Sequence, residues 1–267
     1  MNRTRPTVAD IRAIKGRRQL SMVHIENLDE ARACAAAGID VLSIDTPHWN
    51  AEMRDAAGDC FVQVGLVYGE LHTTGDYLRA AHNARVLGGD CCYCAASNRI
   101  IERLAAEGIP VVGHAGLIPS RRTWTGGFKA VGTTLDTAKL VYRQVKDLEG
   151  AGAFAAEIEV VPEAIATEIA KHTSLVLFSM GAGAGCDAQY LFASDILGYT
   201  DWHTPRHAKQ YRDFRTEYER LQRERVGAFS EFAADVSSGA YPQPEHVVSV
   251  DDVVREQFLQ FVNGPHR

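Results

Sequence analysis

The sequence predicts an α/β protein that folds as a (β/α)8 TIM barrel with extra C-terminal helices. A unit of helix, glycine and short apolar run recurs along the chain, and this alternation is typical of a parallel sheet covered by helices. Eight apolar runs fall within 267 residues, a normal length for one barrel. No GxGxxG motif follows the first run, which argues against a dinucleotide-binding sheet. We therefore expect one barrel domain over residues 1–267.

The recurring unit is clearest in ARACAAAGIDVLSID and IERLAAEGIPVVGHAG, residues 31–45 and 101–116. In each, a glycine supplies the left-handed residue that ends a helix. The apolar run after it is short and continuous, as in a strand buried on both faces. The expected strands are 20–25, 41–45, 60–66, 91–95, 111–116, 155–160, 175–181 and 190–193. The expected helices are 28–37, 76–87, 98–107, 134–149 and 163–171, and the connection 46–59 is only weakly helical.

The last part of the chain has a different pattern. From about residue 205 it is rich in charge, with apolar or aromatic residues at helical spacing: Tyr211, Phe214, Tyr218, Leu221, Phe229, Phe232 and Val236. This spacing predicts an amphipathic helical extension over 205–240. We expect it to pack on the barrel or on a neighbouring subunit, since no Pro/Gly/Ser linker precedes it.

Composition excludes several classes of protein. There are 28 basic and 34 acidic residues, giving a formal charge of −6, which argues against a nucleic-acid partner. No run approaches the roughly 18 apolar residues of a membrane span. Four of the six cysteines (Cys34, Cys91, Cys92 and Cys94) fall inside expected helix or strand and resemble small buried hydrophobes. We therefore expect a reduced, cytoplasmic protein that acts on a small molecule.

Polar residues at the ends of the expected strands indicate where the chemistry lies, because barrel active sites form at the carboxyl ends of the strands. The strand-end residues are His24, Glu26, Asp45, Thr46, Tyr68, Glu70, Tyr93, His114, Glu157, Glu159 and Ser179. Several carboxylates and two histidines at one mouth suit a divalent cation and proton transfer at carbon.

Each candidate also has a structural explanation. Asp45 is either a ligand or a cap, and His114 is either functional or a core histidine held by the backbone. Glu159 is costly to bury in its apolar strand unless it is paired or functional. Glu157 is its partner on the same face or a solvated rim residue. The glycines of 179–189 either bind a phosphate or make a tight turn.

Several segments resemble the ketopantoate hydroxymethyltransferase family. They are GIPVVGHAGLIPS, GGFKAVG, LEGAGAFAAEIEVVPEAIATEIAKH, MGAGAGCDAQYLFASDILGYT, HTPRHAKQY and VSSGAYPQPEH, in order over about 100–246. The resemblance implies a barrel of the phosphoenolpyruvate mutase/isocitrate lyase superfamily and a ring-shaped homo-oligomer. It also implies transfer of a one-carbon unit from methylenetetrahydrofolate to 3-methyl-2-oxobutanoate. In the family a Mg²⁺ ion holds the 2-oxo acid and stabilises its enolate.

The resemblance assigns roles to some residues of this chain. The family's proton acceptor falls at Glu159, and its substrate-facing histidine at His114. An Asp that approaches the metal and the hydroxyl after it fall at Asp45 and Thr46. With Tyr93 and Ser179, Thr46 completes the expected substrate-binding set.

Other family positions are changed. The second metal-site Asp falls at Gly65, a substrate-binding Lys at Tyr93 and a metal-site Glu at Ala95. Mg²⁺ is therefore expected to be weakly held or replaced by another divalent metal, with Glu70, His72 or Glu26 as partners of Asp45. The use of methylenetetrahydrofolate stays open.

Three functional hypotheses follow. The first is an aldolase-like carbon–carbon bond enzyme, a hydroxymethyltransferase or lyase, that acts through an enolate on a small 2-oxo acid or related carbonyl compound. A substrate different from the family's is favoured over ketopantoate synthesis itself. The second is a hydrolase or decarboxylase on a small oxo acid or ring compound, with water activated by the rewritten mouth (His24, Glu26, His48, Glu70, His72). The third is a catalytically silent binding protein, which the cost of burying Glu159 disfavours.

Overall fold

The computed structural model describes residues 4–201 and 203–264. Eight parallel strands close into a barrel, each paired with its neighbours in sequence and the last with the first. They are β1 (Leu20–His24), β2 (Val41–Asp45), β3 (Phe61–Gly65), β4 (Cys91–Tyr93), β5 (Val111–Gly116), β6 (Ala155–Glu159), β7 (Val176–Met180) and β8 (Ala188–Phe192). The predicted barrel is confirmed, with every strand within two residues of its expected bounds.

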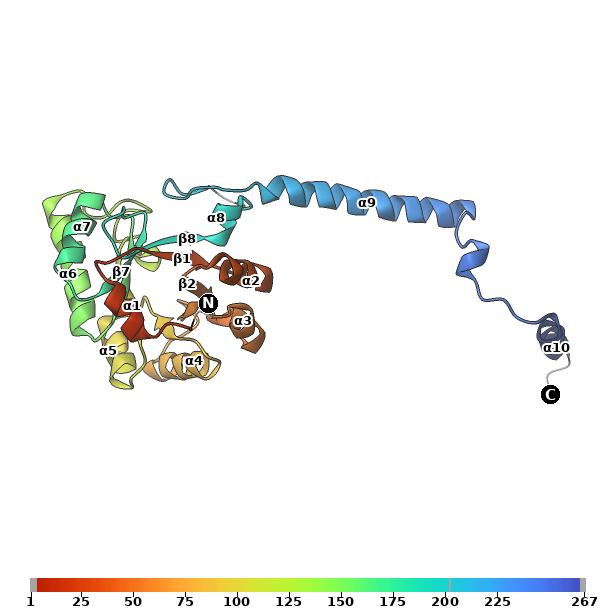
Figure 1. Cartoon of the computed structure of the whole chain (residues 1–267), viewed down its shortest axis with the longest axis horizontal. Coiled ribbons are helices and arrows are strands. Elements are labelled where there is room, and N and C mark those ends of the chain that lie inside the picture. The colour runs from red at the N-terminus through yellow and green to blue at the C-terminus, as the bar shows by residue number, and fades with distance from the viewer. Residues whose placement is uncertain (1–3, 202, 265–267) are drawn as a thin grey trace. The chain divides into compact units, whose positions relative to one another are not determined.

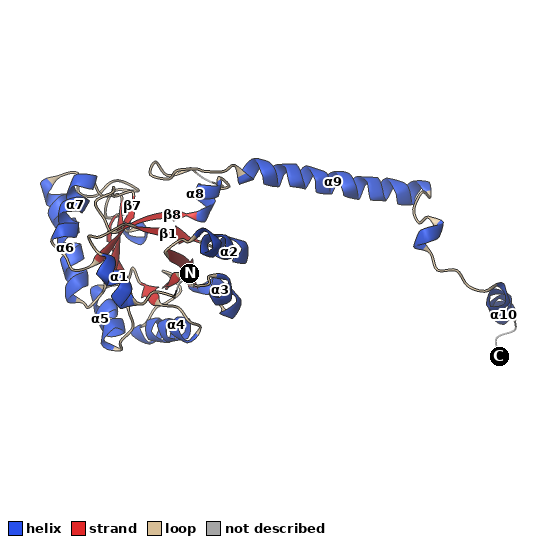
Figure 2. Ribbon diagram, in the orientation of Figure 1, coloured by secondary structure: helices blue, strands red, loops and turns tan. Residues whose placement is uncertain are grey.

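Helices surround these strands (Figures 1 and 2). They are α2 (Leu28–Ala37), α3 (Ala51–Ala56), α4 (Thr74–Val86), α5 (Asn98–Ala106), α6 (Leu135–Gly150), α7 (Glu163–Lys171) and the short α8 (Ala193–Leu197). Between β7 and β8 the structure has a turn, not a helix. The weakly helical connection at 46–59 is a 3₁₀ turn (Thr46–His48) followed by α3.

Two helices, α8 and the amino-terminal α1 (Val8–Ile14), were not expected from the sequence. Ile11 is buried in the apolar cluster that fills the amino-terminal half of the barrel, together with Leu20 and Phe61. Asp187 fixes the end of α1, because its carboxylate accepts from Lys15 Nζ at 2.8 Å and also from the backbone N–H of Leu177 at 2.8 Å. The helix therefore closes the end of the barrel opposite the carboxyl ends of the strands.

Alternate strand residues point into the barrel and form layers, because side chains alternate between the two faces of a strand. The first layer is apolar and contains Val41, Phe61, Val112, Ala155 and Val176. Two residues further along, β2, β3, β5 and β6 contribute Ser43, Gln63, His114 and Glu157 to a polar layer that is also buried, while β7 contributes the apolar Phe178. The carboxyl ends of the strands follow, with Asp45, Tyr93 and Glu159. The core is thus apolar at one end of the barrel and polar at the other.

The chain divides into two compact units, one ending at Asp213 and the other beginning at Phe214. The second unit contains α9 (Phe214–Ser238) and α10 (Asp252–Asn263). Residues 205–213, expected to be helical, are irregular. The reason lies in their hydrogen bonds, since the backbone N–H groups of Tyr211 and Arg212 donate to the carbonyl of Ile196 in α8.

No helix among residues 4–201 and 203–264 is both long and apolar enough to cross a membrane. All six cysteines are free thiols, and all except Cys34 are buried. This agrees with their expected behaviour as small hydrophobes.

Candidate active site

A cavity of about 270 Å³ opens at the carboxyl ends of β2, β3 and β4. Its lining residues are Asp45, Leu66, Val67, Tyr68, Tyr93, Ala95, Ile118, Pro119 and Ser120. Two of them, Asp45 and Tyr93, are polar groups at family positions named above. The hydroxyl of Ser120 is buried and has no hydrogen-bond partner among the described residues, so it is available to a ligand.

His114 lies at the centre of a buried cluster of acid–base groups beside this cavity. Its Nε2 is 3.2 Å from Glu159 Oε2 and 2.9 Å from the carbonyl oxygen of Leu117. Its Nδ1 is 2.7 Å from the hydroxyl of Tyr93 and 3.6 Å from Glu157 Oε2. The imidazole thus bridges two carboxylates of β6 and the tyrosine that borders the cavity.

Two glycines allow β5 to carry His114 at this place. Gly113 packs against α6, where an added Cβ would come within 2.5 Å of Leu148. Gly116 has φ +84°, and a Cβ there would lie 2.4 Å from the carbonyl oxygen of Glu159. The two strands therefore approach closely at the mouth, with His114 opposite Glu157 and Gly116 opposite Glu159 in register.

The residue after Glu159 has a strained backbone. Val160 has φ +48°, a conformation that a β-branched residue rarely adopts. Its N–H donates to Met180 at 2.8 Å, and its carbonyl accepts from Val131 at 3.1 Å. Such strain is concentrated at functional sites, where the surrounding structure holds it. Here it turns the chain directly after the Glu159 carboxylate.

The charges in this cluster shift its proton equilibria. Burial raises the pKa of Glu157 to about 7, against the opposing effect of His114. Burial lowers the pKa of His114, but the hydrogen bond to Glu159 and the charge of Glu157 outweigh burial, so its pKa is raised. Burial also raises the pKa of Tyr93 well above its ordinary value. The cluster can therefore hold a proton near neutral pH while the tyrosine keeps its own.

Glu157 is anchored from the far side of the barrel. Gln63 on β3 donates from Nε2 to Glu157 Oε1 at 2.7 Å and to Ser43 Oγ at 3.2 Å. The Oε1 atom of Gln63 is buried without a hydrogen-bond partner among the described residues. Gln63 was not expected at the site from the sequence, although it is the single amide within the apolar strand FVQVG.

Asp45 does not meet the partners expected for a cation site. Its Oδ1 lies where a side chain at residue 65 would begin, 2.2 Å from a Cβ built on Gly65. Burial raises its pKa, and the negative charges of Glu26 and Glu70 act in the same direction. Within the described ranges, no three His, Cys, Asp or Glu side chains are grouped so as to hold a metal ion. Glu26, Glu70 and His72 therefore do not join Asp45 in a three-ligand group among these residues.

The remaining expected residues are spread around the mouth. Glu26, Glu70 and His72 are exposed on loops, and Thr46 starts the 3₁₀ turn after β2. The hydroxyl of Ser179 donates to the carbonyl of Gly183 at 3.0 Å and accepts from the N–H of Ala182 at 3.1 Å. It is therefore engaged in the turn between β7 and β8.

Two further histidines lie near the mouth. Burial, aided by His48, lowers the pKa of His24 to about 4, which keeps its ring neutral. The ring of His207 covers Gly181, with Nδ1 2.7 Å from the position of an added Cβ. Glu159 acts electrostatically on His207. His207 had no role expected from the sequence, although it lies in the family-like segment HTPRHAKQY.

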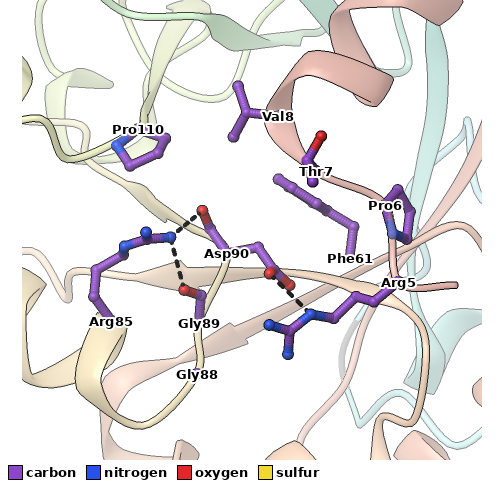
Figure 3. Close-up of a pocket in the computed structure, with 10 residues that line it drawn as sticks. All are labelled: Arg5, Pro6, Thr7, Val8, Phe61, Arg85, Gly88, Gly89, Asp90 and Pro110. Atoms are coloured by element: carbon purple, nitrogen blue, oxygen red, sulfur yellow. Dashed lines mark hydrogen bonds and ion pairs between the residues drawn. The ribbon is translucent and has the colours of Figure 1, made fainter.

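A second cavity, of about 350 Å³, lies at the amino-terminal ends of the strands (Figure 3). Arg85 donates there to the carbonyls of Gly89 and Asp90 at 3.0 and 2.7 Å, and Arg5 pairs with the Asp90 carboxylate at 3.4 Å. Its arginines are thus engaged with the protein itself, as expected at the end of a barrel that contributes stability.

The sequence matches known proteins over most of its length. A family model described as ketopantoate hydroxymethyltransferase matches residues 75–244. The 3-methyl-2-oxobutanoate hydroxymethyltransferase of Halalkalibacterium halodurans is 30% identical over 228 residues, which cover 82% of this chain and 78% of that protein. The protein of the same name from Kosmotoga olearia is 29% identical over 261 residues, covering 87% and 94%.

Solved structures match the fold at low sequence identity. A 2,3-dimethylmalate lyase, a member of the PEP mutase/isocitrate lyase superfamily, has a TM-score of 0.52 at 12% identity, covering 71% of this chain and 81% of its own. The phosphoenolpyruvate phosphomutase of Streptomyces platensis subsp. rosaceus also has a TM-score of 0.52 at 12% identity, covering 97% of each chain. At such identities the similarity shows the barrel alone.

Proposed function

The chain belongs to the ketopantoate hydroxymethyltransferase family, and on that premise we propose that it makes or breaks a carbon–carbon bond beside the carbonyl of a small 2-oxo acid. The reaction proceeds through an enolate. The observation that carries this proposal is the contact of 3.2 Å between Glu159 and His114 at the mouth of the barrel.

In the proposed reaction Glu159 is the base. The proton leaves C3 of the 2-oxo acid for the Glu159 carboxylate, the C–H electron pair becomes the C2–C3 double bond, and the carbonyl π pair moves to oxygen. His114 holds Glu159 in place through Nε2. The nucleophilic C3 then attacks a one-carbon electrophile, or the same steps run in reverse as a lyase. Whether methylenetetrahydrofolate supplies that carbon is decided by assay with and without it.

The substrate pocket differs from that implied by the family resemblance. Tyr93 and Ala95 stand where Lys and Glu are expected, so the cavity has lost one cation and one carboxylate. We assign Tyr93, Thr46 and Ser179 to substrate binding, with Ser179 giving up one turn hydrogen bond to do so. The altered pocket favours a small 2-oxo acid other than 3-methyl-2-oxobutanoate.

A divalent cation, implied by the family resemblance, would meet only Asp45 among the expected ligands. Because no group of three such ligands occurs among the described residues, the proposed steps use the chain's own side chains. The family resemblance further implies a homo-oligomer, and the free, mostly buried cysteines are in keeping with a cytoplasmic setting.

The direct test is exchange of the C3 proton of 3-methyl-2-oxobutanoate in D₂O, followed by NMR with and without added Mg²⁺. This compound probes the enolisation step even if the natural substrate is a close relative. We expect exchange by the wild type and its loss in Glu159→Gln, which keeps the shape of the side chain but not the base. A wild type that exchanges no proton from this or related 2-oxo acids would contradict the proposal.

A further inference from the structure

Tyr93 is placed between the acid–base cluster and the cavity. Its hydroxyl is 2.7 Å from His114 Nδ1, and its side chain lines the cavity together with Asp45 and Ser120. The two rings meet edge to face, with centroids 5.9 Å apart. Tyr93 therefore joins the histidine that contacts the base to the space where a substrate would bind.

The direction of the hydrogen bond between Tyr93 and His114 depends on the proton of the imidazole. A neutral ring that donates from Nε2 to Leu117 accepts the tyrosine proton at Nδ1. A protonated ring donates from both nitrogens, so Nδ1–H points at the phenol oxygen. The Tyr93 O–H is then released and turns to another acceptor. In this state it can donate into the cavity.

We propose that Tyr93 donates the hydrogen bond that stabilises the enolate oxygen, and that Glu157 makes this possible by holding His114 in its protonated form. Tyr93 is then a catalytic residue and Glu157 a positioning residue that acts through His114. This inference rests on the enolate chemistry proposed above. The proton of Tyr93 stays on the phenol throughout, and the proton from C3 goes to Glu159.

The surroundings of Glu157 support its part. Its Oε2 is 3.6 Å from Nδ1, the nitrogen that carries the extra proton, while Gln63 holds its other oxygen at 2.7 Å. The titratable groups that act on Glu157 come from five strands: His114, Glu159, Asp45, Tyr93, Tyr190 and Cys91. Of these, only His114 can carry a positive charge, so the imidazolium is the natural partner of an ionised Glu157.

Tyr93 also answers a chemical need of the altered mouth. An enolate oxygen requires a donor or cation beside it, and this chain has Tyr93 and Ala95 where the family resemblance implies Lys and a metal ligand. A phenol with a raised pKa keeps its proton over the working pH range. Loss of one donor to such an oxygen costs about 10²–10³-fold in rate.

The first test compares Tyr93→Phe with the wild type in the C3 exchange assay. We expect exchange to slow by about 10²-fold, although the base Glu159 is still present. Circular dichroism should show that the variant keeps the fold of the wild type. Tyr77→Phe is the matched control, because it removes the hydroxyl of another buried tyrosine, in α4 outside the barrel. Equal exchange rates in Tyr93→Phe and the wild type would overturn the role of Tyr93.

The second test measures the pKa of His114 without substrate. Of the ten histidines, His114 is identified by the ¹⁵N NMR signals that disappear in His114→Asn. Glu157→Gln removes a charge that raises the pKa of His114, so its titration should move to lower pH. Glu157→Asp should restore part of the shift. The same pKa in all three proteins would overturn the role of Glu157.

The pH profile of exchange links the two tests. Because exchange requires protonated His114, its rate should fall as pH rises through the pKa of His114. That limb should move to lower pH in Glu157→Gln, an effect that a purely structural role would not produce. If the wild type exchanges no proton, the proposed function and the role of Tyr93 fail together, while the His114 titration still decides whether Glu157 controls the proton.

Discussion

At the scale of single residues, the Asp45 carboxylate at the mouth of the barrel lies where a side chain on residue 65 would be. Asp45 Oδ1 fills the position of a side chain on Gly65. Gly65→Ala should therefore displace Asp45 and reduce the free energy of unfolding by about 1–3 kcal/mol, as overpacking does. In Asp45→Ala/Gly65→Ala the conflict is gone, so the double variant should lose less than the sum of the single variants. Additive losses in urea unfolding would contradict this contact.

A second residue-scale prediction concerns Glu149 on α6. Its carboxylate accepts from the N–H and hydroxyl of Ser174 at 2.6 and 2.5 Å and pairs with Lys146, and these partners, against burial, lower its pKa to about 2. A depressed pKa stabilises the fold above the ordinary value of 4.5 and stops doing so as pH falls toward 2.

Glu149→Gln should therefore lower the free energy of unfolding by about 1 kcal/mol at pH 7. The difference from the wild type should shrink between pH 4.5 and 2. Thermal unfolding across this range measures it. Glu102→Gln, which changes an exposed carboxylate on α5, serves as the control and should leave the curve unchanged. A difference that does not depend on pH would argue against the lowered pKa.

Single residues also show where sequence reasoning stops. Glu159 and His114 could be named because each ends an apolar run within a segment like those of a known family. The bond from Gln63 to Glu157 could not, because it joins β3 to β6 across the barrel and depends on the register of every strand between them. The position of Asp45 over Gly65 depends likewise on a rotamer that no pattern encodes.

At the scale of elements, the strands were predictable and two short helices were not. A buried parallel strand is a continuous apolar run ended by a polar group, which is a strong local signal. The helices α1 and α8 have only seven and five residues, too few for a periodic pattern. Helix α1 is stabilised by packing of Ile11 against the amino-terminal end of the barrel. Such a tertiary contact cannot be read from the local sequence pattern.

This explanation of α1 can be tested by Ile11→Ala. The Ile11 side chain is 1% exposed in the apolar cluster at the amino-terminal end of the barrel. Its truncation should reduce the free energy of unfolding by about 3 kcal/mol. Val86→Ala removes methyl groups from a side chain that is 86% exposed at the end of α4 and should change little. Comparable losses in both variants would show that α1 does not pack as described.

At the scale of the whole molecule, the second unit exposes much apolar surface. Residues of α9 and α10 with large exposed apolar side chains include Phe229, Phe232, Phe258 and Phe261, and neither helix buries a residue. Such surface is typical of association sites, so we predict that α9 takes part in self-association. Phe229→Ser/Phe232→Ser in the full chain should give a smaller species in sedimentation velocity. An unchanged sedimentation coefficient would argue against a role of α9 in assembly.

The close approach of Asp45 to Gly65 has a consequence for how this mouth can evolve. A side chain added at residue 65 would collide with Asp45 before it could share a ligand with it. The acidic pair implied by the family is therefore not one substitution away, because Asp45 must first rotate to a different position. Gly65 thus limits which single substitutions the mouth accepts while Asp45 keeps its present position.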